Sequence, residues 1–506
     1  MGPSDHTAVV ETHAAIVFFV GDRAYKLKKP VDLGFLDFRR RTDRETVCHR
    51  EVELNRRLTP DVYLGVADVH GPDGRPCDHL VVMRRMPAER RLSTLIATGE
   101  PVTDHLRRLA RILAGFHATA RRGPAIAAEG TRDALLGRWD ATFAQLRPFH
   151  GDPLDAGAAT EVETRTHDFL AGREPLFAER VEHGHIVDGH GDLIADDIFC
   201  LPDGPRALDC LEFDDRLRYL DTIDDAAFLA MDLEHLGALG QARAFLDWYM
   251  EFSGDPAPAA LRHHYLAYRA FVRAKVGCLR HAQGDPSAAA DVGAYTDLTL
   301  RHLRAGTVRL ILVGGHPATG KTTLAGRLAD HLGAVTLDSD RIRKELAGLP
   351  PDQSAAAAFR HGIYTTDWTE RTYRELLERA GLLLERGETV VLDASWTTPR
   401  HRAAARTLAA RTHSDLHELR CSATDTTIAQ RLAHRAGGYS DADAAITAAM
   451  SAAAHPWPEA HDVITDRDLD EAVPRALALI RAPVQTAAES TIEAIPALAF
   501  PAAGNG

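Results

Sequence analysis

The first third of the chain begins with alternating and apolar runs that are typical of strands. The segments AAIVFFV at 14–20 and RAYKLKK at 23–29 flank a Gly-Asp pair, which predicts a β-hairpin. A charged, helix-forming stretch follows at about 39–58, and further strands are expected near 62–70 and 79–84. The front of the chain is therefore predicted to be rich in strands, with one helix among them.

From about residue 103 the pattern becomes helical. The segment HLRRLARILAGFHATA places Leu106, Leu109, Leu113 and Phe116 on one apolar face. Around 185–213 the pattern predicts loop and short strands, and long helical patterns resume from about 224 to 303.

The pattern changes again at RAGTV, residues 304–308. Short apolar runs now alternate with amphipathic helices, and these runs are VRLILVG, AVTLDSD, ETVVLDA, LHELRCS and HDVITD. Unbroken apolar runs suit strands that are buried on both faces, so we expect a doubly wound α/β fold with a parallel sheet. The segment 481–506 is rich in Ala and Pro without a clear period, and it predicts a disordered tail.

The chain has 506 residues, which is too long for one core and predicts two or three domains. We place the boundaries at 1–305, 306–480 and 481–506. The net charge of −13 argues against electrostatic binding of nucleic acid by the protein as a whole. The six cysteines form no ligand set, and no signal peptide or membrane span is visible, so we expect a cytoplasmic protein with reduced thiols.

The segment GHPATGKT at 315–322 fits the G-x-x-x-x-G-K-[ST] phosphate-binding loop, between an apolar strand and a helix. Its glycines let backbone N–H groups point at phosphate, Lys321 reaches the β- and γ-phosphates of ATP, and Thr322 binds Mg²⁺. The predicted cofactor-binding residues are Gly315, His316, Pro317, Ala318, Thr319, Gly320, Lys321, Thr322 and Thr323.

Carboxylates follow the next two strands of this half. Asp338 and Asp340 end the segment LDSD, where one can accept a hydroxyl proton and one can cap the next helix. Arg343 is a candidate ligand for an anionic group of the acceptor. Asp393 ends the segment TVVLD and is a candidate metal ligand.

Arg431 and Arg435 lie four residues apart on one predicted helix. They suit a mobile lid that clamps the transferring phosphoryl group, although a solvated basic face is the alternative for Arg435.

Residues 307–480 resemble the small-substrate P-loop kinases, which include gluconate and shikimate kinases, zeta toxins and phage polynucleotide kinase. The resemblance implies that Lys321 and Thr322 bind ATP and Mg²⁺, that Asp340 is the catalytic base, and that Arg343 binds the acceptor.

The segment HGDLIADDIF crowds Asp192, Asp196 and Asp197 into one loop. It resembles the catalytic loop of aminoglycoside phosphotransferases and related kinase-like enzymes, which implies a bilobal α+β fold for residues 1–305. By this resemblance Asp192 is the catalytic base. Asp197 stands where the family has a metal-binding Asn, and the change keeps an oxygen ligand for Mg²⁺ while adding a negative charge.

The same resemblance implies further parts of a nucleotide site. A strand lysine should be held by a helix glutamate, and Lys26 and Glu51 are the candidates, with Lys28 and Glu53 as alternatives. A second metal-binding acid should follow the catalytic loop.

That second acid is Asp209, with Glu212 as its competitor, and Asp225 is implied in a structural role. One departure is that no glycine-rich loop precedes the hairpin. Asp214, Asp215 and Asp221 could recognise an amino sugar or could form a solvated surface.

In this order of halves the chain resembles fused proteins described as bifunctional aminoglycoside phosphotransferase-like and P-loop (AAA-type) ATP-binding proteins. We therefore expect an ATP- and Mg²⁺-dependent phosphotransferase that acts on small-molecule hydroxyls. Two alternatives stay open, namely a nucleotide-sensing regulator in which one half is a binding module, and a polynucleotide 5′-hydroxyl kinase in the C-terminal half.

Overall fold

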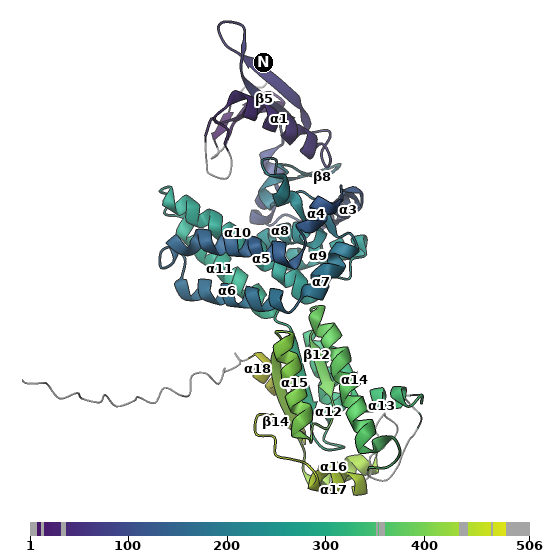
Figure 1. Cartoon of the computed structure of the whole chain (residues 1–506). Coiled ribbons are helices and arrows are strands. Elements are labelled where there is room, and N and C mark those ends of the chain that lie inside the picture. Colours follow the sequence, from purple (N-terminus) through teal and green to yellow (C-terminus); the bar gives the residue numbers. More distant parts are fainter. Residues whose placement is uncertain are drawn as a thin grey trace, which may run out of the picture. The chain divides into compact units, whose positions relative to one another are not determined.

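The chain is described by a computed structural model (Figure 1). The structure describes residues 8–11, 15–31, 37–350, 353, 360–434, 444–466 and 469–481. It divides into two compact units, of which the first runs to Arg309 and includes Glu378–Thr389 and Thr407–Ser414. The predicted tail lies outside the described residues, except for Arg481 at the end of the last helix.

The first unit opens with an antiparallel sheet in the order β1-β2-β3-β5-β4. The strands are β1 (Ala8–Glu11), β2 (Ala15–Val20), β3 (Arg23–Lys28), β4 (Tyr63–His70) and β5 (Pro76–Arg84). The predicted hairpin is thus confirmed as β2 and β3, and the predicted helix as α1 (Arg41–Asn55). Cys48 and Val52 of α1 pack with Ala24 of β3 and Val81 of β5 in one core.

Helices make up most of the rest of this unit. They are α2 (Leu92–Ala97), α3 (Thr103–Thr119), α4 (Pro124–Ala128), α5 (Arg132–Leu146), α6 (Ala156–Ala171), α7 (Glu174–Glu182), α8 (Thr222–His235), α9 (Leu239–Ser253), α10 (Ala259–Ala282) and α11 (Ala288–Ala305). Two short antiparallel pairs lie among them, β6 (Ile186–Asp188) with β9 (Tyr219–Asp221) and β7 (Ile198–Leu201) with β8 (Gly204–Ala207). The predicted apolar face of α3 is buried.

Helix α8 is buried along almost its whole length, although it carries three aspartates. Each of them has a polar partner. Arg269 donates to Asp224, the backbone N–H groups of His190 and Gly191 donate to Asp225, and that of Ala195 donates to Asp232. A buried carboxylate is tolerated only with such partners, so α8 holds the loop 190–195 in place.

The second unit is a doubly wound α/β fold with the strand order β11-β12-β10-β13-β14. The strands are β10 (Arg309–Gly314), β11 (Val335–Asp338), β12 (Val390–Asp393), β13 (Asp415–Ser422) and β14 (His461–Ile464), as the apolar runs predicted. The pairs β10·β12, β11·β12 and β13·β14 are parallel.

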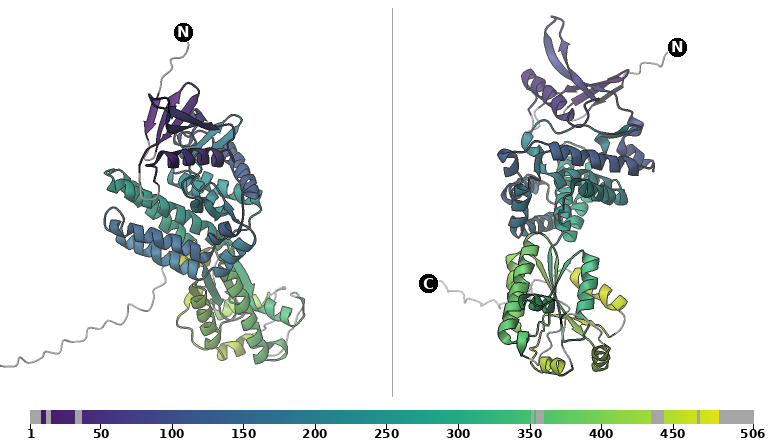
Figure 2. Two further views of the ribbon diagram at one scale, coloured as in Figure 1. Left: turned by 45° about the horizontal axis from the view of Figure 1, so that its top comes forward. Right: turned by 90° about the vertical axis from the view of Figure 1, so that its right-hand side faces the viewer.

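Helices flank both faces of this sheet (Figure 2). They are α12 (Lys321–Leu332), α13 (Ser339–Leu346), α14 (Thr366–Glu385), α15 (Pro399–Arg411), α16 (Asp425–Ala433), α17 (Ala444–Ala452) and α18 (Leu469–Arg481). Helices α12 and α18 share a core with the central strands. The strand order reverses at β10, so the crevice beyond its carboxyl end is the expected ligand site.

The six cysteines are all unpaired, and five are buried. Among the described residues, no helix combines the length and the apolar character that crossing a membrane requires.

Candidate active sites

Strand β3 and helix α1 bring two lysines to one glutamate. The period of a strand places Ala24, Lys26 and Lys28 on one face, and α1 packs against that face. Lys26 Nζ lies 3.0 Å from Glu51 Oε1, and Lys28 Nζ lies 2.6 Å from Glu51 Oε2. Glu51 is fully buried, whereas Glu53 is exposed and pairs with a half-buried arginine of α1. The predicted Lys26–Glu51 pair is therefore present, and Lys28 shares its glutamate.

The two candidate metal-binding acids divide between the two lysines. Asp209 Oδ1 lies 2.5 Å from Lys26 Nζ, and Glu212 pairs with Lys28. Burial opposes the effect, but the charges of Lys26 and Lys28 hold the pKa of Asp209 below its usual value. Asp209 has a φ of 63°, a left-handed conformation that costs energy in a residue with a side chain.

The loop that contains the candidate base Asp192 is held in place by α8. The backbone N–H groups of His190 and Gly191 donate to the two carboxylate oxygens of Asp225 at 2.7 and 2.9 Å. His117 of α3 contacts the same carboxylate at 3.0 Å. Asp225 thus has the structural role that the sequence predicted, because it positions the loop just before Asp192.

Asp192 and Asp197 share one loop, and both interact electrostatically with Asp209, which follows them in the sequence. Burial, together with the charge of Asp209, raises the pKa of Asp192 to about 6. Burial and the charges of Asp209 and Asp192 raise the pKa of Asp197 well above its usual value. Asp196 behaves differently, since it is exposed and accepts a hydrogen bond from Ser93.

This mutual repulsion fits a site for a divalent cation. Within the described part of the chain, no three side chains of His, Cys, Asp or Glu gather into a preformed metal site. Mg²⁺ in phosphotransferases typically takes one or two carboxylates and fills its shell with phosphate and water oxygens. Asp197 and Asp209 match that donor set, and a bound cation would relieve the repulsion that raises the pKa of Asp197.

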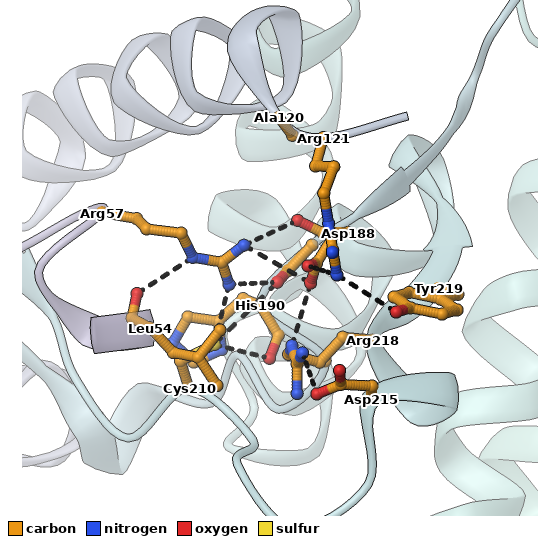
Figure 3. A network of polar contacts seen from close by, with 12 residues as sticks. Leu54, Arg57, Ala120, Arg121, Asp188, His190, Cys210, Asp215, Arg218 and Tyr219 are labelled. Carbon is orange, nitrogen blue, oxygen red and sulfur yellow. Dashed lines mark hydrogen bonds and ion pairs between the residues drawn. The ribbon is translucent and has the colours of Figure 1, made fainter. Parts of the chain in front are cut away.

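A second network ties the segment just before the Asp192 loop to the residues that follow α1 (Figure 3). Arg57 donates to the carbonyl oxygens of Asp188 and Gly189 at 2.9 and 2.8 Å, and the Asp188 carboxylate accepts from Arg218 at 2.9 Å. Sequence analysis missed Arg57, because its partners lie more than 130 positions away and no local motif marks it.

The acidic residues after the loop do not form a solvated surface as a group. Asp221 is buried, and Arg180 donates to both of its oxygens at 2.8 and 2.6 Å. Asp215 pairs with Arg218 and Asp214 caps a short helical turn. The solvated-surface interpretation is therefore wrong for Asp221, and its carboxylate is already satisfied within the fold.

Replacing each of the two candidate metal-binding acids, Asp209 and Glu212, by its amide is expected to distinguish their roles. Asp209→Asn should raise the Mg²⁺ concentration that gives half-maximal turnover at this site by at least about tenfold, because a metal ligand is lost. The matched variant Glu212→Gln should change it little, because Glu212 pairs with Lys28. A Mg²⁺ titration of initial rates checks this. If the half-maximal Mg²⁺ concentration rose more in Glu212→Gln than in Asp209→Asn, Glu212 would be the metal ligand instead.

The elevated pKa of Asp192 predicts that turnover at the candidate site of the first unit, called the first site, falls at acidic pH. A base must be deprotonated, so the rate should be full above the pKa of about 6 and should fall as the pH drops through that value. An aspartate with an ordinary pKa would keep the rate constant down to a pH of about 5. A pH profile of kcat/KM with the Lys321→Ala chain tests this, and a flat profile between pH 5 and pH 7 would contradict it.

In the second unit, the phosphate-binding loop joins β10 to α12. Gly315 has a φ of 134°, and a Cβ there would lie 2.6 Å from the carbonyl oxygen of Cys421 on β13. Gly320 has a φ of 84° and precedes the first turn of α12. Both positions therefore require glycine, and the loop has the predicted strand–loop–helix context. Lys321 Nζ donates to the carbonyl oxygen of His316 at 2.9 Å within the loop.

A second group of polar side chains surrounds the start of α12. Burial raises the pKa of Asp393, opposed by the charge of Lys321 and a hydrogen bond with Thr322. Asp393 Oδ2 is buried without a hydrogen-bond partner. A hydroxyl and an unpartnered carboxylate oxygen are ligands that Mg²⁺ prefers, so these two residues fit the predicted metal site.

The two aspartates after β11 have different environments. Asp338 caps α13 by accepting from the N–H of Arg341 at 2.8 Å, and burial and the charge of Asp393 raise its pKa to about 6. Asp340 lies in the first turn of α13, with the Arg343 guanidinium 3.9 Å away. The prediction that capping explains one of the pair is confirmed, and Asp340 stays the candidate base.

Two predicted arginines are engaged within the fold. Arg343 is buried and donates to the Ile363 carbonyl and the Thr369 hydroxyl. Arg431 of α16 donates to the carbonyl oxygens of Ala318 and Thr465 at 3.3 and 2.6 Å. Arg431 thus reaches the phosphate-binding loop itself. Arg435 lies outside the described residues.

Thr465, which follows β14, is a contact that sequence analysis missed. Its hydroxyl donates to the carbonyl oxygen of Thr319 at 2.6 Å, and this bond links the phosphate-binding loop to the end of β14. A single threonine at a strand end carries no sequence signal of this kind.

Comparisons with known proteins found the following similarities. The family described as AAA domain matches residues 310–457. A choline/ethanolamine kinase family protein from Mesorhizobium loti is 16% identical and covers 60% of this chain and 91% of its own, with a TM-score of 0.37. A gluconokinase from Sinorhizobium meliloti is 21% identical and covers 34% of this chain and 92% of its own, with a TM-score of 0.26.

Fold and sites together define a protein of two units, an α+β unit that begins with an antiparallel sheet and a doubly wound α/β unit with a phosphate-binding loop, as the sequence predicted. An uncharacterized protein of Mycobacterium tuberculosis is 46% identical over 477 residues, which cover 94% of this chain and 96% of that protein. The chain belongs to the family of that mycobacterial protein.

Proposed function

We propose that the protein is an ATP- and Mg²⁺-dependent phosphotransferase with two nucleotide sites, which transfer phosphate to hydroxyl groups of small molecules. The observation that supports this most is the convergence of Lys26, Glu51, Asp192, Asp197 and Asp209 in the first unit. These side chains come from four segments of the chain, and a lysine–glutamate pair beside three carboxylates is the donor set that phosphoryl transfer needs.

At the first site, Lys26 would bind the phosphates of ATP, oriented by Glu51. Asp197 and Asp209 would hold Mg²⁺, which neutralises charge on the phosphates. Asp192 would accept the proton of the acceptor hydroxyl. The hydroxyl oxygen would bond to the γ-phosphorus of ATP as the bond between that phosphorus and ADP breaks. Catalysis would come mainly from positioning and from charge neutralisation.

At the second site, the backbone of 315–320 and the start of α12 would cradle the phosphates. Lys321 and Arg431 would contact the transferring group, and Thr322 and Asp393 would hold Mg²⁺. Asp340 would be the base, with Arg343 beside it. The acidic net charge argues against a nucleic-acid acceptor here.

The test is ATP turnover by the full chain with a panel of small hydroxyl acceptors, comparing the wild type with Asp192→Asn and with Lys321→Ala. We expect each variant to lose a different set of acceptors. If Lys321→Ala removes every activity and Asp192→Asn removes none, the first unit is a binding module and the regulator alternative is preferred. If the second site phosphorylates 5′-hydroxyl oligonucleotides and Asp340→Asn abolishes this, the polynucleotide kinase alternative is preferred.

A further inference from the structure

Helix α10 presents two arginines to the catalytic loop. Arg269 and Arg273 lie four residues apart, and therefore on one face of the helix. Arg269 is buried, donates to both oxygens of Asp224 at 2.7 and 2.8 Å, and reaches the carbonyl oxygen of Gly191 at 3.3 Å. Its charge is thus neutralised, and it anchors α10 against the residue that precedes Asp192.

Arg273, one turn further along, has no such carboxylate partner. It is half-buried, and among the described residues no carboxylate lies within ion-pair distance of it. Its Nε is buried without a hydrogen-bond partner, whereas the rest of the guanidinium hydrogen-bonds with Tyr295 on α11 and lies 5.9 Å from the centroid of that ring. Burial raises the pKa of Asp192, and the charge of Arg273 opposes that shift, which places the two side chains in one electrostatic neighbourhood.

Burial opposes the charge of Arg273, but Tyr295, Asp192 and Asp232 together hold the pKa of the guanidinium above its usual value, so the group stays charged. Because no carboxylate among the described residues forms a direct ion pair with it, its planar fork can bind the oxygens of a carboxylate or a phosphate. The same positive charge would repel a cationic acceptor such as an amino sugar. The three carboxylates that could have recognised amino groups have partners within the fold, since Asp221 pairs with Arg180, Asp215 pairs with Arg218 and Asp214 caps a helical turn.

We infer that the acceptor of the first site carries an anionic group, either a carboxylate or a phosphate, and that Arg273 binds this group beside Asp192. The inference rests on the proposed function of the first site, and it adds the charge of the substrate. Arg273 contributes to acceptor binding, whereas Lys26 contributes to nucleotide binding, so their variants should affect different Michaelis constants.

The experiment uses the full chain with Lys321→Ala, so that the first site alone turns over. ADP release is measured with glycerol, glycerate, glycerophosphate and the cationic kanamycin as acceptors. We expect glycerate or glycerophosphate to exceed glycerol by at least about tenfold in kcat/KM, as a charge-assisted hydrogen bond allows. The comparison of the two anions distinguishes a carboxylate from a phosphate.

Adding Arg273→Ala should raise the KM of the preferred anion by about tenfold or more and leave the KM of ATP nearly unchanged, and Arg273→Lys should recover part of the loss. Arg280→Ala is the matched control, because Arg280 lies on the same helix and pairs with Asp285. A preference for kanamycin or glycerol, or an equal loss for all acceptors in Arg273→Ala, would overturn the inference.

If none of these acceptors is phosphorylated, the proposed function of the first site fails for this panel, and binding decides the inference separately. Glycerophosphate is then titrated calorimetrically into the Lys321→Ala chain with and without Arg273→Ala. Binding that disappears with Arg273→Ala supports an anion site, and equal or undetectable binding to both chains refutes it.

Discussion

Replacing Asp192 by Asn should lower kcat at the first site by about 10²–10⁴-fold, the range that a general base contributes. The amide has nearly the size of the carboxylate but cannot accept a proton from the acceptor. The loop around it should stay in place, because its backbone N–H groups are held by Asp225 and not by Asp192 itself. Initial rates of ADP release in the Lys321→Ala chain isolate this site and measure the loss.

Asp196→Asn supplies the matched control for this experiment. Asp196 belongs to the same loop and loses the same charge, but it is exposed and bonded to Ser93. We expect its rate to stay within about twofold of the parent, as for most surface substitutions. If Asp192→Asn retained the parent rate while both proteins melted at the parent temperature, Asp192 would not be the base of the first site.

Much of the fold could be predicted because its signals are local. The hairpin of β2 and β3 follows from two apolar runs around Gly-Asp. The five strands of the sheet in the second unit follow from unbroken apolar runs between helices. The phosphate-binding loop is also local, since all its residues are consecutive. A local motif is legible in sequence because backbone geometry alone sets its residue types.

Pairings between distant residues were less predictable. The period of a strand places Lys26 and Lys28 on the same face, so no sequence pattern chooses between them. The structure assigns both to Glu51, and it pairs Lys28 with Glu212, 184 positions away. Asp221 and Arg273 show the same limit, because burial and the presence or lack of a direct ion pair depend on tertiary packing.

Lys321→Ala is expected to remove nearly all turnover at the second site, with kcat/KM lower by about 10²–10³-fold, as for loss of a single charge-stabilising donor. The Lys321 side chain begins α12 and already points into its loop, where it donates to the carbonyl of His316. ATP would offer its phosphate oxygens to the same ammonium group, and alanine provides neither the charge nor the donor. Rates in the Asp192→Asn chain isolate this site.

Arg327→Ala is the matched control, because this substitution removes the same charge from an exposed position on the same helix. Its rate should stay near that of the parent, since it lies nearly two turns beyond the loop. Equal losses in the two variants would indicate a general effect of charge on α12 and would contradict a specific contact with phosphate. A loss confined to Lys321→Ala would instead locate the contact at the loop, and the residual rate would then report how much of the catalysis comes from the backbone of 315–320 and from Arg431.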